Sequence, residues 1–378
     1  MANKLADLVP KIYAQSALYL RNNTAMIANV NADYGDEAKE KGEVILVPMA
    51  GDVATTDVQP GPYAPEAGDI APTVAEIKLD QWKEAAFNLT EREYAAIIAG
   101  TIPMQMEAAV ASLADTVNAF LFSKYKKSYG FIGTPGTTPF ASAQDAINAR
   151  KVLSIMKAPL QNRHMIISPE AEAKALGLDN FIQAQMSADP NVVREGDLGR
   201  KLGFYWHMDQ NVPTHVSTPL SAGAATVAVS ASKGTSVVVI AKATNASPLV
   251  AGDIITFAGD AQTYVVVKDT ALAVGNTPVE IMPALKVAKA GGETVSLIGT
   301  HVVNLAMHRD AIAFASRPLI NQDMGGEEIE MSMSGADPQS KLAFRVCIRK
   351  EYHRTRVGID ALYGADCVRP QLITRVAG

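Results

Sequence analysis

The histidines of this sequence stand where a metal ion or a general base would be sought. His301 and His308 are seven residues apart in a strand-like run, so their side chains fall on opposite faces and cannot share one metal ion. His207 and Asp209 would share one strand face, but no serine or cysteine nucleophile motif accompanies them. We expect a structural role for these residues, and a hydrolase that uses His207 and Asp209 stays open as a remote alternative.

Other signatures of catalysis are missing from the sequence. It contains no His-Glu-x-x-His, Gly-x-Ser-x-Gly or Cys-x-x-Cys motif. The glycine-rich segment 130–136 lacks the Gly-Lys-Ser/Thr that holds phosphates, so we interpret it as a loop. Cys347 and Cys367 are the only cysteines, and we expect two inert thiols rather than a disulfide framework. We therefore predict no catalytic residue, no cofactor site and no metal site, and a protein that is not an enzyme.

Two basic clusters remain to be explained. The lysines at 124–127 end a predicted helix, where positive charge suits the negative end of the helix dipole. The second cluster, 349–356, is strand-like, and alternation would direct some of its charges at a neighbouring molecule with an acidic surface. The assembly contacts predicted in this run are Arg349, Arg354 and Arg356.

The composition narrows the class of protein. The chain has 378 residues, of which 48% are hydrophobic and 19% are charged, and a formal net charge of −5. These values are typical of a globular protein with two or three domains. No apolar run approaches the ~20 residues of a membrane span, and the first residues lack the apolar core of a signal peptide, so we expect cytoplasmic synthesis and no membrane partner. An acidic chain also lacks the excess of lysine and arginine that would coat DNA directly.

Residues 216–300 differ in character from the rest of the chain. They contain short β-branched runs, such as 226–229, 236–240 and 264–267, which are separated by Gly, Asp and Asn turn signals. No segment within them has helical periodicity. Closely spaced short strands of this kind predict a small antiparallel barrel or sandwich. Because the flanking residues on both sides look like strand edges, we expect a compact domain inserted into a larger one, with its two ends close together.

The segment 43–89 predicts a long β-hairpin. A strand-like run precedes a tip rich in Pro and Gly at 59–69, and alternation of apolar and polar residues over 74–89 predicts the return strand. A strand of that length at about 3.3 Å per residue reaches roughly 53 Å, against a radius of gyration of about 21 Å for a compact chain of this size. Because an isolated hairpin is only marginally stable, we expect it to lie on another molecule. The assembly contacts predicted in this hairpin are Pro60, Pro62, Tyr63, Pro65 and Trp82.

The remaining segments predict a mixture of helices and strands. A helix at 5–20 and a polar, acidic stretch at 31–43, whose charges we interpret as solvated surface, form an N-terminal arm. Thr90-Glu91-Arg92-Glu93 fits a capping box that begins a short helix. Apolar residues from Met106 to Tyr125 recur at helical spacing and predict a long helix. Further helices are predicted at 143–156, 169–175 and 180–186, and strands at 164–167, 311–315, 342–348, 354–359 and 372–376.

Four segments carry a resemblance to a known family: 77–94, 252–259, 309–319 and 362–370. Together with the order of the predicted parts, they resemble the major capsid proteins of tailed double-stranded DNA bacteriophages, which have the Hong Kong 97-type fold. The segment 216–300 is similar to the insertion domain of the coat proteins of short-tailed Salmonella phages. The resemblance in layout covers nearly the whole chain.

This resemblance implies an α+β fold with the domain divisions of that family. The implied divisions are an N-terminal arm at 1–42, an extended-loop hairpin at 43–89, a spine-helix peripheral domain at 90–140, the first part of an axial domain at 141–215, an inserted β-barrel domain at 216–300, and return strands of the axial and peripheral domains at 301–378.

The resemblance also implies a structural function. The expected activity is self-assembly, as hexamers and pentamers, into an icosahedral procapsid and then a mature capsid that encloses double-stranded DNA without sequence-specific binding. The expected partners are the chain itself, a scaffolding protein and a portal protein, and the expected location is the virion, after synthesis in a bacterial host. An encapsulin-type nanocompartment with enzyme cargo is an alternative, but the inserted segment 216–300 argues against it. Nothing in the sequence indicates autocatalytic cross-linking or proteolytic maturation.

Overall fold

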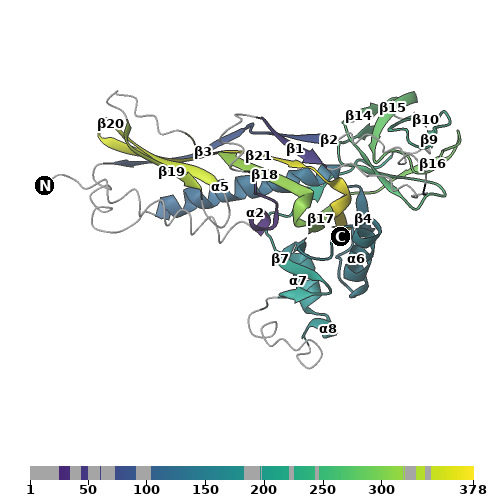
Figure 1. Cartoon of the computed structure of the whole chain (residues 1–378), viewed down its shortest axis with the longest axis horizontal. Helices are drawn as coiled ribbons and strands as arrows, with labels where there is room; N and C mark the ends of the chain where they lie inside the picture. Colours follow the sequence, from purple (N-terminus) through teal and green to yellow (C-terminus); the bar gives the residue numbers. More distant parts are fainter. Residues whose placement is uncertain are drawn as a thin grey trace.

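The molecule is elongated, with the tips of β19 and β20 at one end and a β-barrel at the other (Figure 1). A long helix, α5, and a twisted sheet run along the axis between them. The computed structural model describes residues 25–34, 44–49, 60, 73–90, 104–182, 196, 198–220, 225–242, 247–317, 319, 329–336 and 342–378.

The longest helix packs along a five-stranded sheet. α5 (Met104–Ser123) buries one apolar stripe that includes Val110, Leu113 and Val117, as the helical spacing predicts. It ends in the short 3-10 helix η1 (Lys124–Lys127). The sheet has the order β18-β21-β20-β19, and β3 also pairs with β21. Its strands are β3 (Gln81–Thr90), β18 (Ile312–Arg317), β19 (Ile329–Ala336), β20 (Ala343–Glu351) and β21 (Arg354–Cys367).

A seven-stranded mixed sheet completes the larger part of the molecule. Its order is β4-β22-β17-β5-β7-β6, and β8 pairs with β17. The helices predicted near 143–156 and 169–175 are confirmed as α6 (Gln144–Ile155) and α7 (Pro169–Leu176), and α8 (Asp179–Ile182) follows. Ser168 caps the N-terminus of α7, and its Oγ accepts a hydrogen bond from the Ala171 amide. The strands are β4 (Gly130–Gly133), β5 (Arg163–Ile167), β6 (Arg200–Lys201), β7 (Phe204–Met208), β8 (Thr214–His215), β17 (His301–His308) and β22 (Ile373–Ala377).

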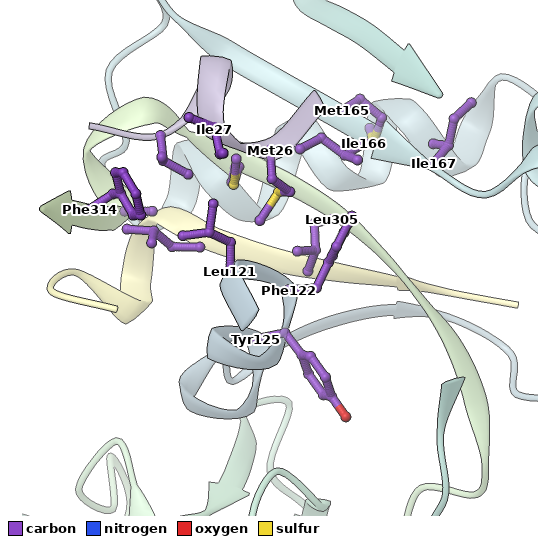
Figure 2. Packing of buried hydrophobic residues seen from close by; sticks show 14 of the residues in the cluster. Met26, Ile27, Leu121, Phe122, Tyr125, Met165, Ile166, Ile167, Leu305 and Phe314 are labelled. Atoms are coloured by element: carbon purple, nitrogen blue, oxygen red, sulfur yellow. The ribbon is translucent and has the colours of Figure 1, made fainter. Parts of the chain in front are cut away.

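One hydrophobic core joins the two sheets and the helices, and we call this whole unit the platform. Met26 and Ile27 of the short helix α2 (Ala25–Asn29) pack into it beside Leu121 and Phe122 of α5 (Figure 2). Tyr125 lies at the edge of the same cluster, and its hydroxyl points away from it (Figure 2). Elements distant in sequence therefore share one interior, which fixes the platform as a single unit.

The predicted hairpin differs from the structure in its return strand. β1 (Val44–Met49) and β2 (Thr73–Lys78) form a two-stranded ribbon, but the strand is interrupted at residues 79–80, and β3 leaves the ribbon to pair with β21. The prediction of one continuous strand over 74–89 was therefore wrong. A Cβ at Gly364 would lie 2.0 Å from the Lys78 carbonyl oxygen, so the chain crosses closely over β21 where it changes partner.

The inner face of the ribbon packs on the platform rather than projecting from it. Ile45, Val47 and Ile77 are almost completely buried against Ala313 and Ala315 of β18. The expectation that the hairpin lies wholly on another molecule is therefore wrong for these six-residue strands, because burial of this apolar face holds them on their own chain.

The barrel is a second unit with its own core. Six strands close in the order β10-β15-β13-β12-β16-β9, and a small hairpin of β11 and β14 lies outside this ring. Along β10, buried residues alternate with more exposed ones, as expected for a sheet with one face inside. The strands are β9 (Ala225–Val227), β10 (Val237–Lys242), β11 (Ser247–Leu249), β12 (Ile254–Phe257), β13 (Thr263–Val266), β14 (Thr270–Leu272), β15 (Gly275–Met282) and β16 (Thr294–Leu297).

The glycine-rich segment 130–136 is only partly a loop. Its first four residues form β4, which pairs in parallel with β22. A Cβ at Gly130 would lie 2.7 Å from Thr374 Oγ1, and one at Gly133 would lie 2.3 Å from the Ala377 carbonyl oxygen. The glycines therefore permit close pairing with β22, which sequence spacing did not indicate. The N-terminal helix at 5–20, the segment 35–43 and the capping-box residues after Thr90 lie outside the described residues.

Candidate interaction surface

A groove on the outer face of the five-stranded sheet brings several charged side chains together. It has a volume of about 460 Å³ and lies across β3, β20 and β21. Alternation creates it: Val346, Val357 and Ile359 point into the platform core, so the residues between them point outward. The groove is lined by Trp82, Glu84, Arg345, Cys347, Arg349, Arg356, Gly358 and Asp360.

Asp360 is the most buried charge in this groove. Arg345, directly opposite in the strand register, donates to both of its carboxylate oxygens, with Nε 3.1 Å from Oδ1 and Nη2 2.6 Å from Oδ2. The Trp82 indole nitrogen also donates to Oδ2 at 3.1 Å. The hydrogen bonds that Arg345 donates to Asp360 raise the pKa of Arg345, which stays charged. A bidentate pair of this kind is geometrically fixed, so it forms a rigid floor for the groove.

A second ion pair forms one side of the groove. Arg356 Nη2 lies 2.8 Å from Glu84 Oε2, and both side chains are partly exposed, so the pair adds little stability. Gly358 lies directly under the Glu84 carboxylate, so a larger residue at this position would make that flexible side chain shift.

Arg349 gives the groove an excess of positive charge. It stands opposite Arg356 in the register of β20 and β21, and it is exposed. Like charges directly opposite each other in a sheet are unfavourable. The groove then holds three arginines against the two carboxylates of Glu84 and Asp360. An anionic group of another molecule would relieve this imbalance.

The ribbon supplies a second candidate surface. Its inner face is buried, but its outer face exposes Val44, Leu46 and Val74, each between 40% and 48% accessible, with Pro48 also exposed. In the register, Pro48 stands opposite Val74, and Leu46 stands opposite Glu76. A two-stranded ribbon with apolar residues on both faces is typical of a segment that is covered by another molecule.

The structure brings together some of the predicted contact residues and separates others. Trp82, Arg349 and Arg356 line one groove, whereas Arg354 lies at the exposed turn between β20 and β21. Pro60 is described and exposed, and the predicted contacts Pro62, Tyr63 and Pro65 lie outside the described residues. Sequence reasoning missed Glu84, Arg345, Cys347 and Asp360. The alternation of Arg345, Cys347 and Arg349 along β20 would have indicated two of them.

The residues considered for hydrolysis serve structural contacts. Asp209 is buried, and its carboxylate accepts hydrogen bonds from Asn118 Nδ2 at 2.7 Å and from the Asn211 amide at 2.8 Å. Burial raises the pKa of Asp209. His207 instead packs against His164, with 3.3 Å between His207 Nε2 and His164 Nδ1. Asp209 therefore ties α5 to the segment after β7 and does not orient His207 for catalysis.

The other side chains that could react are partly or fully buried, or form an ion pair. Burial raises the pKa of the Cys347 thiol and, to about 12, that of Cys367, so neither is an activated nucleophile. Lys127 pairs with both oxygens of Asp366 at 2.7 and 2.6 Å, a contact that the helix-dipole interpretation did not include. Among the described residues, no group of three or more His, Cys, Asp or Glu side chains could hold a metal ion. Within the same residues, no helix combines the length and apolarity needed to cross a membrane.

Comparison with solved structures identifies the fold. A protein of Mycobacterium phage Che8 aligns with a TM-score of 0.51 and 15% identity, over 93% of this chain and 90% of that one. The chain shares the fold of this phage protein. A chain of the mature capsid of bacteriophage PhiM1 aligns with a TM-score of 0.47 and 11% identity, over 94% of this chain and 87% of that one. A chain of the capsid of Cyanophage P-SCSP1u aligns at 0.44 and 12%, over 89% and 84%. No protein-family model and no curated protein sequence matches this chain.

Proposed function

We propose that this chain is the major capsid protein of a tailed bacteriophage, which self-assembles into the icosahedral shell around double-stranded DNA. The observation that carries the proposal is the likeness in fold to the Che8 phage protein over 93% of the chain. The groove and the ribbon support a structural role, because each offers another molecule a surface and the described residues form no catalytic arrangement.

In this proposal, each division of the capsid fold corresponds to a continuous or paired range of residues. Residues 1–42 are the N-terminal arm, and 43–89 are the extended loop, of which the described β1–β2 ribbon is the base. Residues 90–140 carry the spine helix, α5, and residues 141–215 with 301–378 form the axial and peripheral sheets. The barrel within 216–300 is an insertion domain.

The proposed contacts between copies are of two kinds. The outer face of the ribbon would be covered by an apolar surface of a neighbouring copy, because it exposes Val44, Leu46 and Val74. The groove would receive an acidic group of a neighbour, since Arg349 and Arg356 stand opposite each other with one carboxylate, Glu84, beside them. Scaffolding protein, portal protein and packaged DNA are further proposed partners, and the virion is the proposed location.

Electron microscopy of the purified chain tests the proposal. Expressed with its scaffolding protein, the chain should form closed shells tens of nanometres across or larger. A product that stays monomeric under every such condition would contradict a capsid function. The nanocompartment alternative is not favoured.

A charge reversal tests the groove within this proposal. Arg349→Glu should leave the circular dichroism and the melting temperature of the unassembled chain nearly unchanged, because the side chain is exposed, while it reduces the yield of closed shells at least tenfold. Lys151→Glu, an equally exposed reversal on α6, is the control and should assemble normally. Normal shells from the Arg349→Glu variant would show that the groove is not a contact between copies.

A further inference from the structure

The hydrophobic core of the barrel is separate from the core of the platform. The 15 residues of the barrel core all belong to the barrel segment, and the platform core contains none of them. Leu220 and Leu297, which lie near the ends of the barrel segment, pack on the barrel side. Two units joined without a common hydrophobic interior are expected to move relative to each other unless specific contacts prevent it.

The chain enters and leaves the barrel through two segments that lie side by side, and we call this pair the stalk. β8 pairs with the start of β17, with His215 opposite His301. Beyond this pair, the Ser217 amide donates to Thr300 Oγ1 at 3.1 Å, and the Thr300 hydroxyl donates to the Ser217 carbonyl at 3.2 Å. A stalk of two strands defines one position for a hinge.

At the stalk, a buried row of three side chains, of which His215 is the middle one, connects the platform to the barrel. The Tyr125 hydroxyl, in η1, lies 2.9 Å from His215 Nδ1, and His215 Nε2 lies 2.9 Å from Asp253 Oδ1. His215 is 3% exposed and Asp253 is fully buried. In the tautomer that donates from Nε2 to the Asp253 carboxylate, His215 Nδ1 accepts a hydrogen bond from the Tyr125 hydroxyl. Figure 2 shows the Tyr125 hydroxyl pointing away from the platform core.

The backbone beside Asp253 is held from the platform as well. Arg375 Nη1 donates to the Gly252 carbonyl at 2.8 Å, and its Nη2 donates to the carbonyls of Tyr125 and Ser128. A Cβ at Gly252 would lie 3.1 Å from Lys126 Cγ, and Gly252 has φ +101°. The turn at 252–253 therefore packs closely against η1.

The same joint contains polar atoms that are buried without a partner. Within the described part of the chain, Arg375 Nε and His301 Nε2 have none, and the His301 ring lies 5.4 Å from the His215 ring. Burial lowers the pKa of Arg375 to about 10 and that of His301 to about 4. Buried polar groups that lack partners are costly, and they regain hydrogen bonds when water enters. The closed joint is thus opposed by hydration and depends on the contacts that hold it, which also include the hydrogen bond from Thr263 Oγ1 to the Tyr129 carbonyl.

We infer that Tyr125, His215 and Asp253 form a latch that fixes the barrel in one orientation on its stalk, and that releasing the latch lets the barrel swing as a rigid unit with both cores intact. The latch is a conformational device of the single chain. It goes beyond the proposed function, since its operation does not require that the chain assemble.

Hydrogen exchange of the unassembled full-length chain, read by mass spectrometry, tests the latch. His215→Phe removes both hydrogen bonds of the ring, and Asp253→Asn removes the charge while it keeps an oxygen for the Val250 amide, which Asp253 binds at 2.7 Å. Both variants should exchange at least tenfold faster in the stalk peptides 214–220 and 298–302, and the barrel strands should keep their protection within twofold. Small-angle scattering should show a wider distribution of distances.

Two further variants keep the test decisive. Tyr125→Phe keeps the ring beside Arg375, so it should fold even where His215→Phe does not, and it should give a smaller increase at the same peptides. Asp260→Asn is the matched control, because Asp260 pairs with the buried Lys289 inside the barrel and not at the joint. It should increase exchange in the barrel and leave the stalk unchanged. Unchanged stalk exchange in the latch variants, or loss of protection throughout the barrel, would overturn the inference.

Discussion

The barrel and the ribbon are both built from β-strands, yet the barrel has no unpaired strand edge and each strand of the ribbon has one. The six strands of the barrel close on each other, so each has a partner on both sides, and 15 buried residues form a core that belongs to the barrel alone. The ribbon has only two strands, and its buried cluster needs Ala313 and Ala315 of β18. Closure makes the barrel self-sufficient, whereas the ribbon depends on what surrounds it.

We propose that the barrel is a stabilising element and that the ribbon is an element of contact with a neighbour. The ribbon exposes Val44, Leu46 and Val74 on the face that its own chain does not cover, so its remaining apolar surface is available to a neighbour. The barrel meets the platform through polar contacts at the stalk and the latch, and through the hydrogen bond that Thr263 Oγ1 donates to the Tyr129 carbonyl. Each of the following experiments would strengthen or remove this contrast.

Excision should give the largest difference between the two regions. A protein of residues 216–300 should fold by itself, since its core needs no platform residue, and a peptide of residues 43–79 should not fold, since its core does. Dispersed amide NMR signals and strand-type circular dichroism for the first, and a coil spectrum for the second, are the expected results. A disordered spectrum for 216–300 would remove the claim that the barrel is self-sufficient.

A buried charge in the barrel core should have the next largest effect. Val279 is completely buried in β15, and Val279→Asp places an unpaired carboxylate there, at a cost of several kcal/mol in the free energy of unfolding. Val287→Asp, at a position that is 55% exposed, is the control and should change that free energy by less than about 0.5 kcal/mol. Urea titration of the excised barrel measures both. Equal effects would mean that the barrel has no specific core.

Acid should destabilise the platform and not the barrel. All six histidines lie outside residues 225–297. Burial lowers the pKa of both His164 and His301 to about 4, whereas the unfolded chain takes up these protons near pH 6.5. The unfolded state therefore binds more protons between pH 6.5 and 4, and platform stability falls as the pH falls through this range, by an amount on the order of a few kcal/mol.

Thermal melts between pH 7.5 and 4.5 measure this difference. The full-length chain should lose stability on acidification, and the excised barrel should change little. In the barrel, the hydrogen bonds to Asp260 outweigh its burial and hold its pKa below the usual value, so that this carboxylate stays charged over the range tested. A barrel as sensitive to acid as the full-length chain would contradict the assignment of the effect to the platform histidines.

The outer face of the ribbon should show the smallest effect on the isolated chain. Leu46 is 47% exposed, so Leu46→Gln should change the free energy of unfolding by less than about 0.5 kcal/mol. The same variant should assemble poorly, because the apolar face that a neighbour would cover is interrupted. Val229→Gln, at a similarly exposed position beyond β9, is the control and should assemble normally. Sedimentation of the assembly products distinguishes the two variants.

The sequence determined the elements whose signals are local. Helical spacing located α5, because the apolar stripe repeats every 3.6 residues wherever the helix packs. β-branched runs bounded by Gly, Asp and Asn indicated the strands of the barrel, since both the strand preference and the turn geometry depend on neighbouring residues. The resemblance in the order of parts also indicated the fold type.

Only the tertiary structure decided which segments meet. The sequence pattern over 74–89 predicts one strand, but the chain changes partner at residues 79–80, where Gly364, which lies far along the chain, approaches it closely. The groove combines Glu84 of β3 with Arg345 of β20 and Asp360 of β21. The latch joins Tyr125, His215 and Asp253 from three separate segments. Hydrogen bonds of this kind form where folding brings donors and acceptors within about 3 Å, and no spacing within a single segment encodes that distance.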